Sequence, residues 1–200
     1  MDNMDLSTIR IIGTEIAGRL ERTGDPIKLD LGCGKFKKNG FTGIDLSPQA
    51  DLQWDINWGL PFSNCVVSEI SSEHFFEHLM PEGLINAFRE CRRVLIDGGT
   101  LDFSVPHFEP YLEAYLKKDL NFLKEKIYDI PKGQEDFYST CFDRIIWLLH
   151  RSGEHKCMFD RESILAKVRL AGFKNVTTRE YDPARDVIFR FSSVYVVAVK

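Results

Sequence analysis

The chain has 200 residues, 44% of them hydrophobic, and a formal net charge of −4 at pH 7. This apolar content can bury one substantial core and leaves little room for a second, so we expect a single domain over residues 1–200. The charges are spread along the chain apart from the basic group Lys35, Lys37 and Lys38, which excludes nucleic acid as a main partner.

The sequence shows no sign of a membrane span or a signal peptide. No apolar run approaches the roughly 18 residues of a span, and the first ten residues, MDNMDLSTIR, lack the order of a signal peptide. We therefore predict a cytoplasmic protein. The sequence leaves its oligomeric state open. The five cysteines are odd in number and scattered, without a C-x-x-C pair, so we expect free and mostly buried thiols.

The first half of the chain alternates predicted strands and helices. Residues 6–21 place apolar side chains at helical spacing, and Gly24-Asp25-Pro26 ends that pattern. A second helix begins at Pro81, buries one apolar stripe and ends at Gly98-Gly99. The strands predicted around these helices are 27–31, 41–45, 50–55, the end of 64–72, and 100–105. This alternation predicts a parallel sheet with both faces covered by helices.

The second half carries a helical segment followed by two more strands. Residues 107–151 are rich in aromatic and charged side chains, and we interpret them as a helical insertion or lid after the fifth strand. Asp160 caps another helix, which precedes strands 176–181 and 194–199. The connection 182–191 has no helical stripe, so the last strand should be antiparallel. The predicted fold is α/β, with a Rossmann-like seven-stranded, mostly parallel sheet.

A glycine turn, Gly32-Cys33-Gly34, follows the first predicted strand, where ligands of open parallel sheets bind. The dinucleotide fingerprint G-x-G-x-x-G would need glycine in place of Lys37 and an acid about 20 residues on, whereas Asp45 follows Gly32 by only 13. This spacing disfavours a pyrophosphate cofactor and suits an adenosine without phosphate, as in S-adenosylmethionine. For the tripeptide alone, an ordinary tight turn is an equal alternative.

Six segments around and beyond the turn carry a more specific pattern: LDLGCGK (29–35), GIDLS (43–47), DINWGLPF (55–62), SSEHFFEHL (71–79), RECRRVLIDGGTLDFSVP (89–106) and HKCMFDRESILAKVRLAGFKNV (155–176). Together they cover most of the chain. They resemble the class I S-adenosylmethionine-dependent methyltransferases, in particular small predicted methyltransferases with a shortened first crossover. The resemblance implies a Rossmann-like fold, S-adenosylmethionine as cofactor, and methyl transfer.

The resemblance also implies which residues contact the cofactor. Gly32 and Gly34 would lie against its methionine and ribose, Asp45 would accept hydrogen bonds from the ribose hydroxyls, and Asp55 with Ile56 would hold the adenine. The full implied set is Asp30, Gly32, Gly34, Asp45, Leu46, Asp55, Ile56, Ser72 and Glu73. From the residues alone, Asp45 could equally be a turn residue and Asp55 a cap.

The connection between the first two strands departs from the usual pattern. Residues 32–41 are fewer than the dozen or so that a parallel crossover normally takes. The helix that usually covers the cofactor should therefore be one turn or absent, and this edge of the site more open. We interpret the lysines of the connection as part of a solvated loop.

Methyl transfer from a sulfonium is an in-line displacement, so the protein must mainly hold the acceptor close to the methyl group. A base is needed only where the acceptor atom is protonated, and histidine suits that role. His107 directly follows the fifth strand and is the predicted base, with His74 as the second catalytic candidate. His155 and Tyr111 are predicted to bind the acceptor, whereas we interpret His78 as a helix-start residue of the fold.

A metal site is the weaker interpretation of the same region. Glu73-His74 and Glu77-His78 repeat at a four-residue spacing, and Glu109 lies further along the chain. Such a site needs a third or fourth ligand from elsewhere, and nothing in the sequence marks one. We therefore expect no metal.

Three functions remain open from the sequence. The leading one is an S-adenosylmethionine-dependent methyltransferase with a small-molecule or glycan-precursor acceptor and residues 107–151 as its lid. The second is an S-adenosylmethionine-binding partner or regulatory protein without transfer activity. The third is a nucleotide-binding oxidoreductase, which suits the lysine loop but not the glycine spacing.

Overall fold

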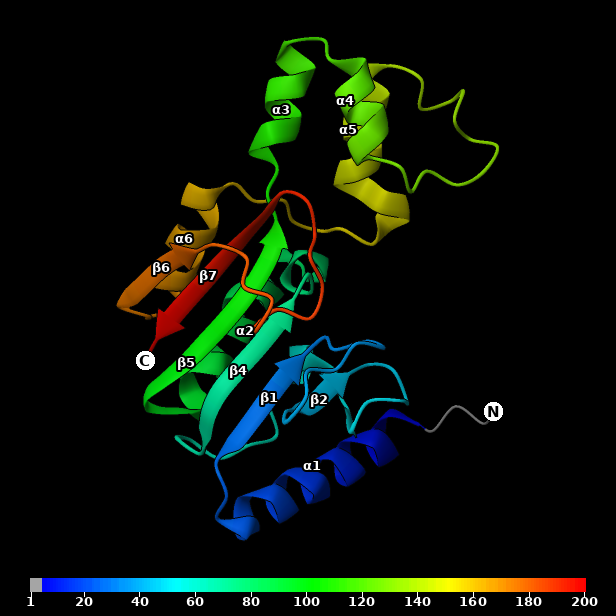
Figure 1. Ribbon diagram of the computed structural model, residues 1–200. Helices are drawn as coiled ribbons and strands as arrows, with labels where there is room; N and C mark the ends of the chain where they lie inside the picture. The colour runs from blue at the N-terminus through cyan, green and yellow to red at the C-terminus, as the bar shows by residue number, and fades with distance from the viewer. Residues whose placement is uncertain (1–4) are drawn as a thin grey trace.

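The computed structural model describes residues 5–200, and its strands form one seven-stranded sheet (Figure 1). The strands are β1 (Ile27–Leu31), β2 (Thr42–Asp45), β3 (Leu52–Gln53), β4 (Val67–Glu73), β5 (Leu95–Pro106), β6 (Asn175–Arg179) and β7 (Ser193–Val199). Their order in the sheet is β3-β2-β1-β4-β5-β7-β6. Only β7 runs antiparallel to its neighbours β5 and β6. The predicted Rossmann-like, mostly parallel sheet with an antiparallel last strand is confirmed.

Three helices pack against the sheet, and local sequence sets where they begin. α1 (Leu6–Thr23) starts at the capping residue Asp5, and α2 (Pro81–Val94) has proline in its first turn. α6 (Arg161–Leu170) starts at the capping residue Asp160. Two short 3-10 helices, η1 (Ile56–Trp58) and η2 (Phe76–His78), follow β3 and β4.

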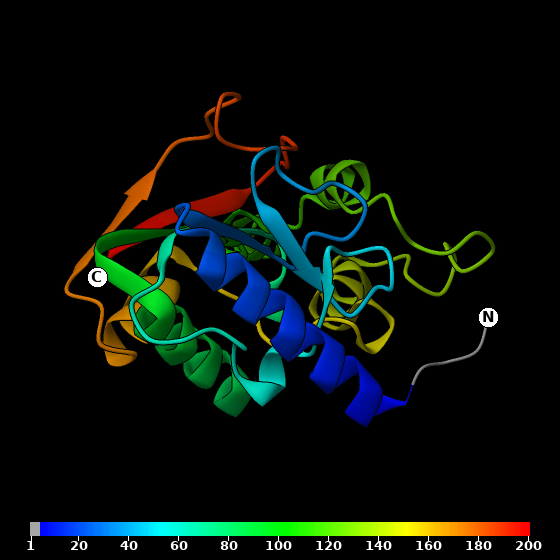
Figure 2. The ribbon, with the colours of Figure 1, turned by 90° about the horizontal axis from the view of Figure 1, so that it is seen from below.

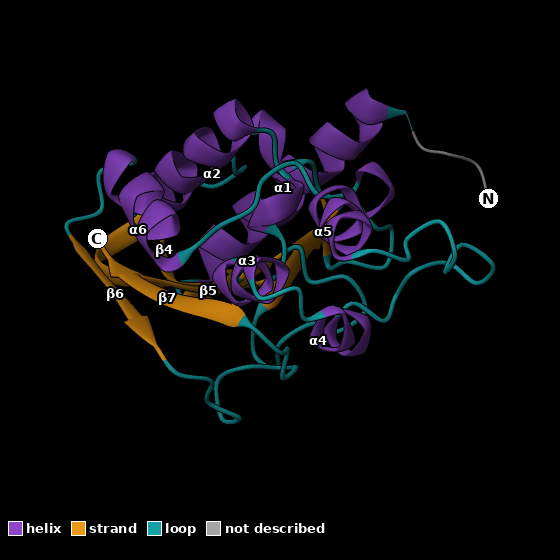
Figure 3. Cartoon of the chain, turned by 90° about the horizontal axis from the view of Figure 1, so that it is seen from above, coloured by secondary structure: helices purple, strands orange, loops and turns teal. Residues whose placement is uncertain are grey.

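Helices α1, α2 and α6 lie on the same face of the sheet (Figures 2 and 3). Their buried side chains join those of the strands in one apolar cluster, which includes Leu29, Ile70 and Leu101. The helices expected on the opposite face are not present among residues 5–200. The physical reason is that the connections between β1 and β2 and between β2 and β3 are too short to hold a helix, as the sequence predicted for the first of them.

The opposite face of the sheet is polar and is covered by loops. Asp30 on β1 and Asp102 on β5 are both buried there. The backbone N–H of Lys38, in the β1–β2 loop, donates to Asp30 at 2.8 Å. Arg185, in the β6–β7 loop (residues 180–192), pairs with Asp102 at 2.8 Å. Ionic and backbone contacts therefore replace a helical layer on this face.

The segment after β5 forms a helical insertion, as predicted, beyond the carboxyl ends of the central strands (Figure 1). It has its own apolar cluster around Leu123 and Trp147. Its role as a lid stays a prediction, and so does the single-domain organisation. Its helices are α3 (Glu109–Leu116), α4 (Leu120–Lys126) and α5 (Cys141–His150).

Two further expectations concern membranes and thiols. None of the helices within residues 5–200 combines the length and the apolar character needed to cross a membrane. All five cysteines are unpaired, as predicted. Only Cys33 and Cys91 are buried, however, while Cys65 is exposed and Cys141 and Cys157 are half-buried, so the expectation of mostly buried thiols is wrong.

Candidate functional site

Gly32 and Gly34 form the turn that follows β1. Their φ angles are 66° and 50°, in the region that glycine tolerates best. The Gly32 N–H donates to the Ile44 carbonyl at 2.8 Å, which ties the turn to β2. A Cβ at Gly32 would lie 2.4 Å from the ring of Phe75, so only glycine lets the chain pass this ring.

Two cavities meet at Gly32. The first, here the β2 cavity, has a volume of about 140 Å³ and is lined by Asp45, Leu46, Asp55 and Ile56. The second, the β4 cavity, has a volume of about 130 Å³ and is lined by Asp30, Gly34 and Glu73. Ser72 lines neither cavity, because its buried hydroxyl donates to the Leu31 carbonyl at 2.9 Å. All other residues implied for the cofactor therefore gather around one turn.

Asp45 and Asp55 already make hydrogen bonds with the backbone. Asp45 accepts from the Gly34 N–H at 3.0 Å and from the Ser47 N–H at 2.8 Å. Asp55 accepts from the Asn57 N–H at 2.9 Å and caps η1. The turn and cap roles that the sequence left open are therefore present. A carboxylate has further lone pairs for a ligand, so the ribose and adenine roles stay predictions.

Asp30 lies beneath the turn with only 5% of its surface exposed. Burial raises the pKa of this carboxyl to about 6, although its hydrogen bond from the Lys38 N–H acts in the opposite direction. The nearby Glu73 carboxylate contributes to this rise of the pKa. A buried acid that lines a cavity and carries a perturbed pKa is typical of functional positions.

The β6–β7 loop forms one wall of the β4 cavity, and sequence reasoning missed it. The Glu73 carboxylate accepts hydrogen bonds from the Val187 N–H at 2.5 Å and the Ile188 N–H at 3.2 Å. These bonds hold the loop across the carboxyl end of β4, so that Val187, Ile188 and Arg190 line the cavity. The one signal in the sequence was an acid at a strand end, which does not name its partners.

A third cavity, of about 220 Å³, lies between the insertion and the β6–β7 loop; we call it the insertion cavity. His74 and Arg190 line both this cavity and the β4 cavity, so they form a shared wall. Tyr111 and His155, the residues predicted to bind an acceptor, both line it. Its polar and charged lining includes His74, Tyr111, Lys126, Asp129, Arg151, His155 and Arg190, and Asp129 pairs with Arg151 at 2.6 Å.

His74 is held in an unusual backbone conformation, with φ at 51°. Its Nε2 lies 2.7 Å from the Ser193 hydroxyl oxygen, which ties the imidazole to the start of β7. Burial lowers the pKa of His74 to about 3, so the ring is neutral at physiological pH. The second catalytic candidate is therefore a neutral, fixed imidazole between two cavities.

His107, the predicted base, lies elsewhere. Its Nε2 is 3.1 Å from a Glu109 carboxylate oxygen, and its backbone N–H donates to the Ser192 carbonyl at 2.8 Å. It lines none of the three cavities. A β-bridge to Phe159 fixes the backbone here. The strand therefore ends close to where the sequence placed it, but the imidazole contacts Glu109 instead of lining a cavity.

Neither a comparison with protein-family models nor one with curated proteins gives a match. A comparison with solved structures does give matches. A S-adenosylmethionine-dependent methyltransferase from Archaeoglobus fulgidus is 15% identical, with 94% of each chain covered and a TM-score of 0.50. A possible histamine N-methyltransferase from Thermotoga maritima is 14% identical, with 94% of this chain and 92% of that chain covered and a TM-score of 0.52. The chain has the class I S-adenosylmethionine-dependent methyltransferase fold.

A further structure, described as PigF with SAH, is 14% identical, with 97% of this chain and 58% of that chain covered and a TM-score of 0.51. At these identities the likeness shows the methyltransferase fold alone. In this methyltransferase fold, the cavities at Gly32 lie at the carboxyl ends of β1, β2 and β4, which is where open parallel sheets bind their ligands.

Proposed function

We propose that this chain transfers a methyl group from S-adenosylmethionine to a small-molecule or glycan-precursor acceptor. The observation that carries the proposal is the adjacency of the three cavities. The β2 and β4 cavities meet at Gly32, and the β4 and insertion cavities share His74 and Arg190. In-line transfer requires donor and acceptor to lie side by side, and this arrangement provides two adjoining sites.

The residues around Gly32 fit the proposed donor. A Cβ at Gly34 would meet nothing within 4 Å, so the turn leaves open space for a ligand. Asp45 and Asp55 offer carboxylate oxygens to hydroxyl and amino groups, and Ile56 offers an apolar surface to a base. Asp30 offers an acidic group to an ammonium in the β4 cavity. When bound, S-adenosylmethionine supplies an electrophilic methyl group on a sulfonium.

The chain's own part in the reaction is mainly to position the acceptor. Both ring nitrogens of His74 face protein groups, Nε2 the Ser193 hydroxyl at 2.7 Å and Nδ1 the Glu77 carboxyl at 3.6 Å, so the ring would shape the site rather than bond the acceptor. Tyr111 and His155 would border the rest of the molecule. A pKa of about 3 makes His74 a weak proton acceptor. We therefore assign most of the rate acceleration to proximity and orientation.

Arg190 favours an acceptor that carries a negative group. Within residues 5–200, no carboxylate lies within ion-pair distance of its guanidinium, although the side chain is half-buried between the two cavities. A guanidinium matches the geometry of a phosphate or carboxylate group. Glycan precursors that bear phosphate have this chemistry.

The test is a binding and turnover assay on the purified chain. Calorimetry with S-adenosylmethionine, S-adenosylhomocysteine and dinucleotides would identify the donor, and a screen of phosphorylated and unphosphorylated acceptors would be scored by release of S-adenosylhomocysteine. Arg190→Gln should raise the KM for phosphorylated acceptors by roughly 10- to 100-fold, because a charged hydrogen bond contributes about 1.5–3 kcal/mol. Arg185→Gln is the matched control, since Arg185 binds Asp102 and lines none of the three cavities.

Two outcomes would replace the proposal. Tight binding of S-adenosylmethionine without turnover on any acceptor would identify a non-catalytic partner or regulatory protein. Dinucleotide binding without S-adenosylmethionine binding would identify an oxidoreductase.

A further inference from the structure

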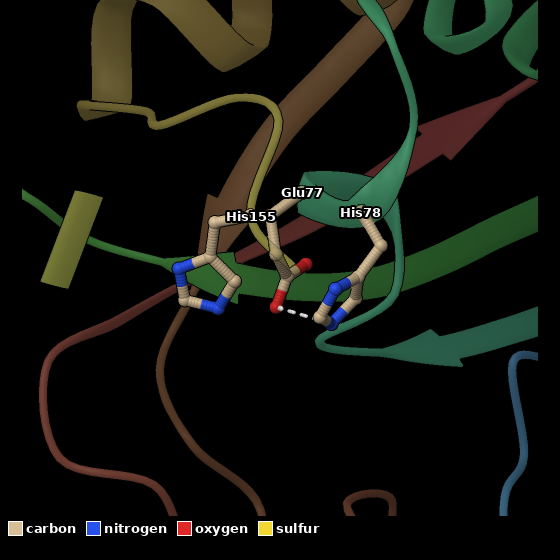
Figure 4. A group of neighbouring side chains, drawn as sticks. All are labelled: Glu77, His78 and His155. Atoms are coloured by element: carbon tan, nitrogen blue, oxygen red, sulfur yellow. Dashed lines mark ion pairs between the residues drawn. The ribbon is translucent and has the colours of Figure 1, made fainter. Parts of the chain in front are cut away.

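Three potential ligand side chains meet where the insertion returns to the sheet (Figure 4). Glu77 and His78 belong to η2, and His155 follows α5 on the return segment. One ligand atom from each residue lies within 4.8 Å of the other two, and a Glu77 oxygen is 3.9 Å from His78 Nε2. The sequence paired Glu77 with His78 but gave no means of finding the third member, His155.

Glu77 is a carboxyl group without an adequate partner. Only 1% of it is exposed. Its Oε1 lies 3.6 Å from His74 Nδ1 and 3.9 Å from His78 Nε2, both too long for a hydrogen bond. Its Oε2 has no hydrogen-bond partner among the described residues. An unpaired buried carboxyl is costly, so the fold lacks a group that would satisfy it.

The two imidazoles are oriented to present a lone pair. His78 Nδ1 lies 3.1 Å from the Glu154 carbonyl oxygen, and His155 Nδ1 lies 2.9 Å from the Leu148 carbonyl oxygen. A carbonyl only accepts hydrogen bonds, so in each ring Nδ1 must carry the proton and Nε2 the lone pair. Metal-binding histidines are typically fixed in this way, by donating the other ring N–H to a carbonyl or carboxylate.

We propose that Glu77, His78 and His155 bind a divalent transition-metal ion, with Zn²⁺ as the best match. Two imidazoles and one carboxylate suit zinc, and three protein ligands leave a fourth position open. Mg²⁺ and Ca²⁺ prefer oxygen ligands, which this group does not supply in number. Zinc bonds of about 2.0–2.2 Å place tetrahedral ligand atoms about 3.4 Å apart, so the three side chains need only close inward by about 1 Å.

The proposed ion would connect the two halves of the candidate site. The N–H groups of Lys156 and Cys157 already donate to the Glu77 carbonyl, at 2.8 and 3.0 Å. His78 lines the β2 cavity, whereas His155 lines the insertion cavity. A metal held by both histidines would fix the root of the insertion to the helix that follows β4. This inference does not depend on methyl transfer.

The test is metal binding by the full chain, without cofactor or acceptor. The protein would be stripped with a chelator, dialysed against Zn²⁺ with a competing chromogenic chelator, and analysed for metal content; Co²⁺ would report the geometry by its visible absorption. We expect one Zn²⁺ per chain, and at least tenfold weaker binding in His155→Ala, Glu77→Gln and His78→Ala. His150→Ala is the matched control, since this exposed histidine ends α5 outside the group, and it should bind zinc like the wild type.

Two results would overturn the proposal. One is wild-type protein that binds no more zinc than His155→Ala, and the other is loss of binding in His150→Ala to the same extent. Should Glu77→Gln or His155→Ala fail to fold, His78→Ala decides the matter, because that side chain is 38% exposed and its removal is mild. Unchanged zinc affinity in a folded His78→Ala would exclude the site.

Discussion

Replacing Asp30 with asparagine should make the protein more stable at neutral pH and weaken its binding of S-adenosylmethionine. Asp30 is buried under the glycine turn, where it accepts a hydrogen bond from the Lys38 N–H at 2.8 Å. Asparagine has nearly the same shape and keeps an oxygen for that N–H, while it removes a charge that the fold holds away from water.

The magnitude follows from the two pKa values. The carboxyl has a pKa of about 6 in the folded protein against 3.8 when exposed, which corresponds to roughly 3 kcal/mol. Because the folded pKa is the higher one, the native state holds the proton more tightly. This contribution to stability is fully present below pH 3.8 and is lost as the pH rises through 6. At pH 7.5 the wild type has lost it, so Asp30→Asn should be more stable by roughly 2 kcal/mol after allowing for the cost of burying the amide.

The assay is urea unfolding followed by circular dichroism at pH 5 and pH 7.5. The stability advantage of Asp30→Asn should grow between these two values. Asp51→Asn is the control and should have the opposite effect on stability. Burial acts to raise the pKa of Asp51, but hydrogen bonds from Lys37 and Gly43 outweigh it and lower the pKa. Loss of this carboxylate should therefore destabilise the protein at neutral pH. Parallel profiles for wild type and Asp30→Asn would show that Asp30 titrates as an ordinary solvated acid, and unchanged cofactor affinity would refute its place in the site.

Four further substitutions test the site. Gly32→Ala should destabilise the fold by roughly 2–5 kcal/mol in urea titrations, because it adds a positive-φ cost to a clash with Phe75; a wild-type midpoint would contradict the close approach. Asp45→Ala should weaken S-adenosylmethionine binding by roughly 10- to 100-fold in calorimetry, and unchanged affinity in a folded variant would leave Asp45 a turn residue only. His74→Ala should lower kcat by about tenfold or more, whereas His107→Ala should keep it near the wild-type value; the reverse result would restore His107 as the base.

The regular elements could be predicted because their signals are local. Apolar spacing correctly placed the start of α2 and the end of β5. The predicted helix end at Gly98-Gly99 and strand start at residue 100 are wrong, because α2 ends at Val94 and β5 already begins at Leu95. The missing helical stripe before β7 correctly predicted its direction. The predicted strand 50–55 is shorter in the structure, where only Leu52–Gln53 pair with β2, because Asp55 caps η1 and turns the chain away. The alternation of apolar residues indicates a strand, but it does not show that a capping residue will start a helix before the alternation ends.

The walls of the cavities could not be predicted, because they depend on contacts between distant residues. Glu73 and Val187 are 114 positions apart, and His78 and Glu154 are 76 apart. Neither contact leaves a periodic or compositional trace. The position of His107 was predictable from the strand end, but the direction of its imidazole depends on Glu109 and on pairing with the β6–β7 loop.

The β2 cavity and the insertion cavity share no lining residue, and nothing from the helical insertion borders the β2 cavity. The two cavities therefore have separate linings, and the β4 cavity lies between them. A donor whose adenosine lies in the β2 cavity would meet an acceptor under the insertion across the β4 cavity.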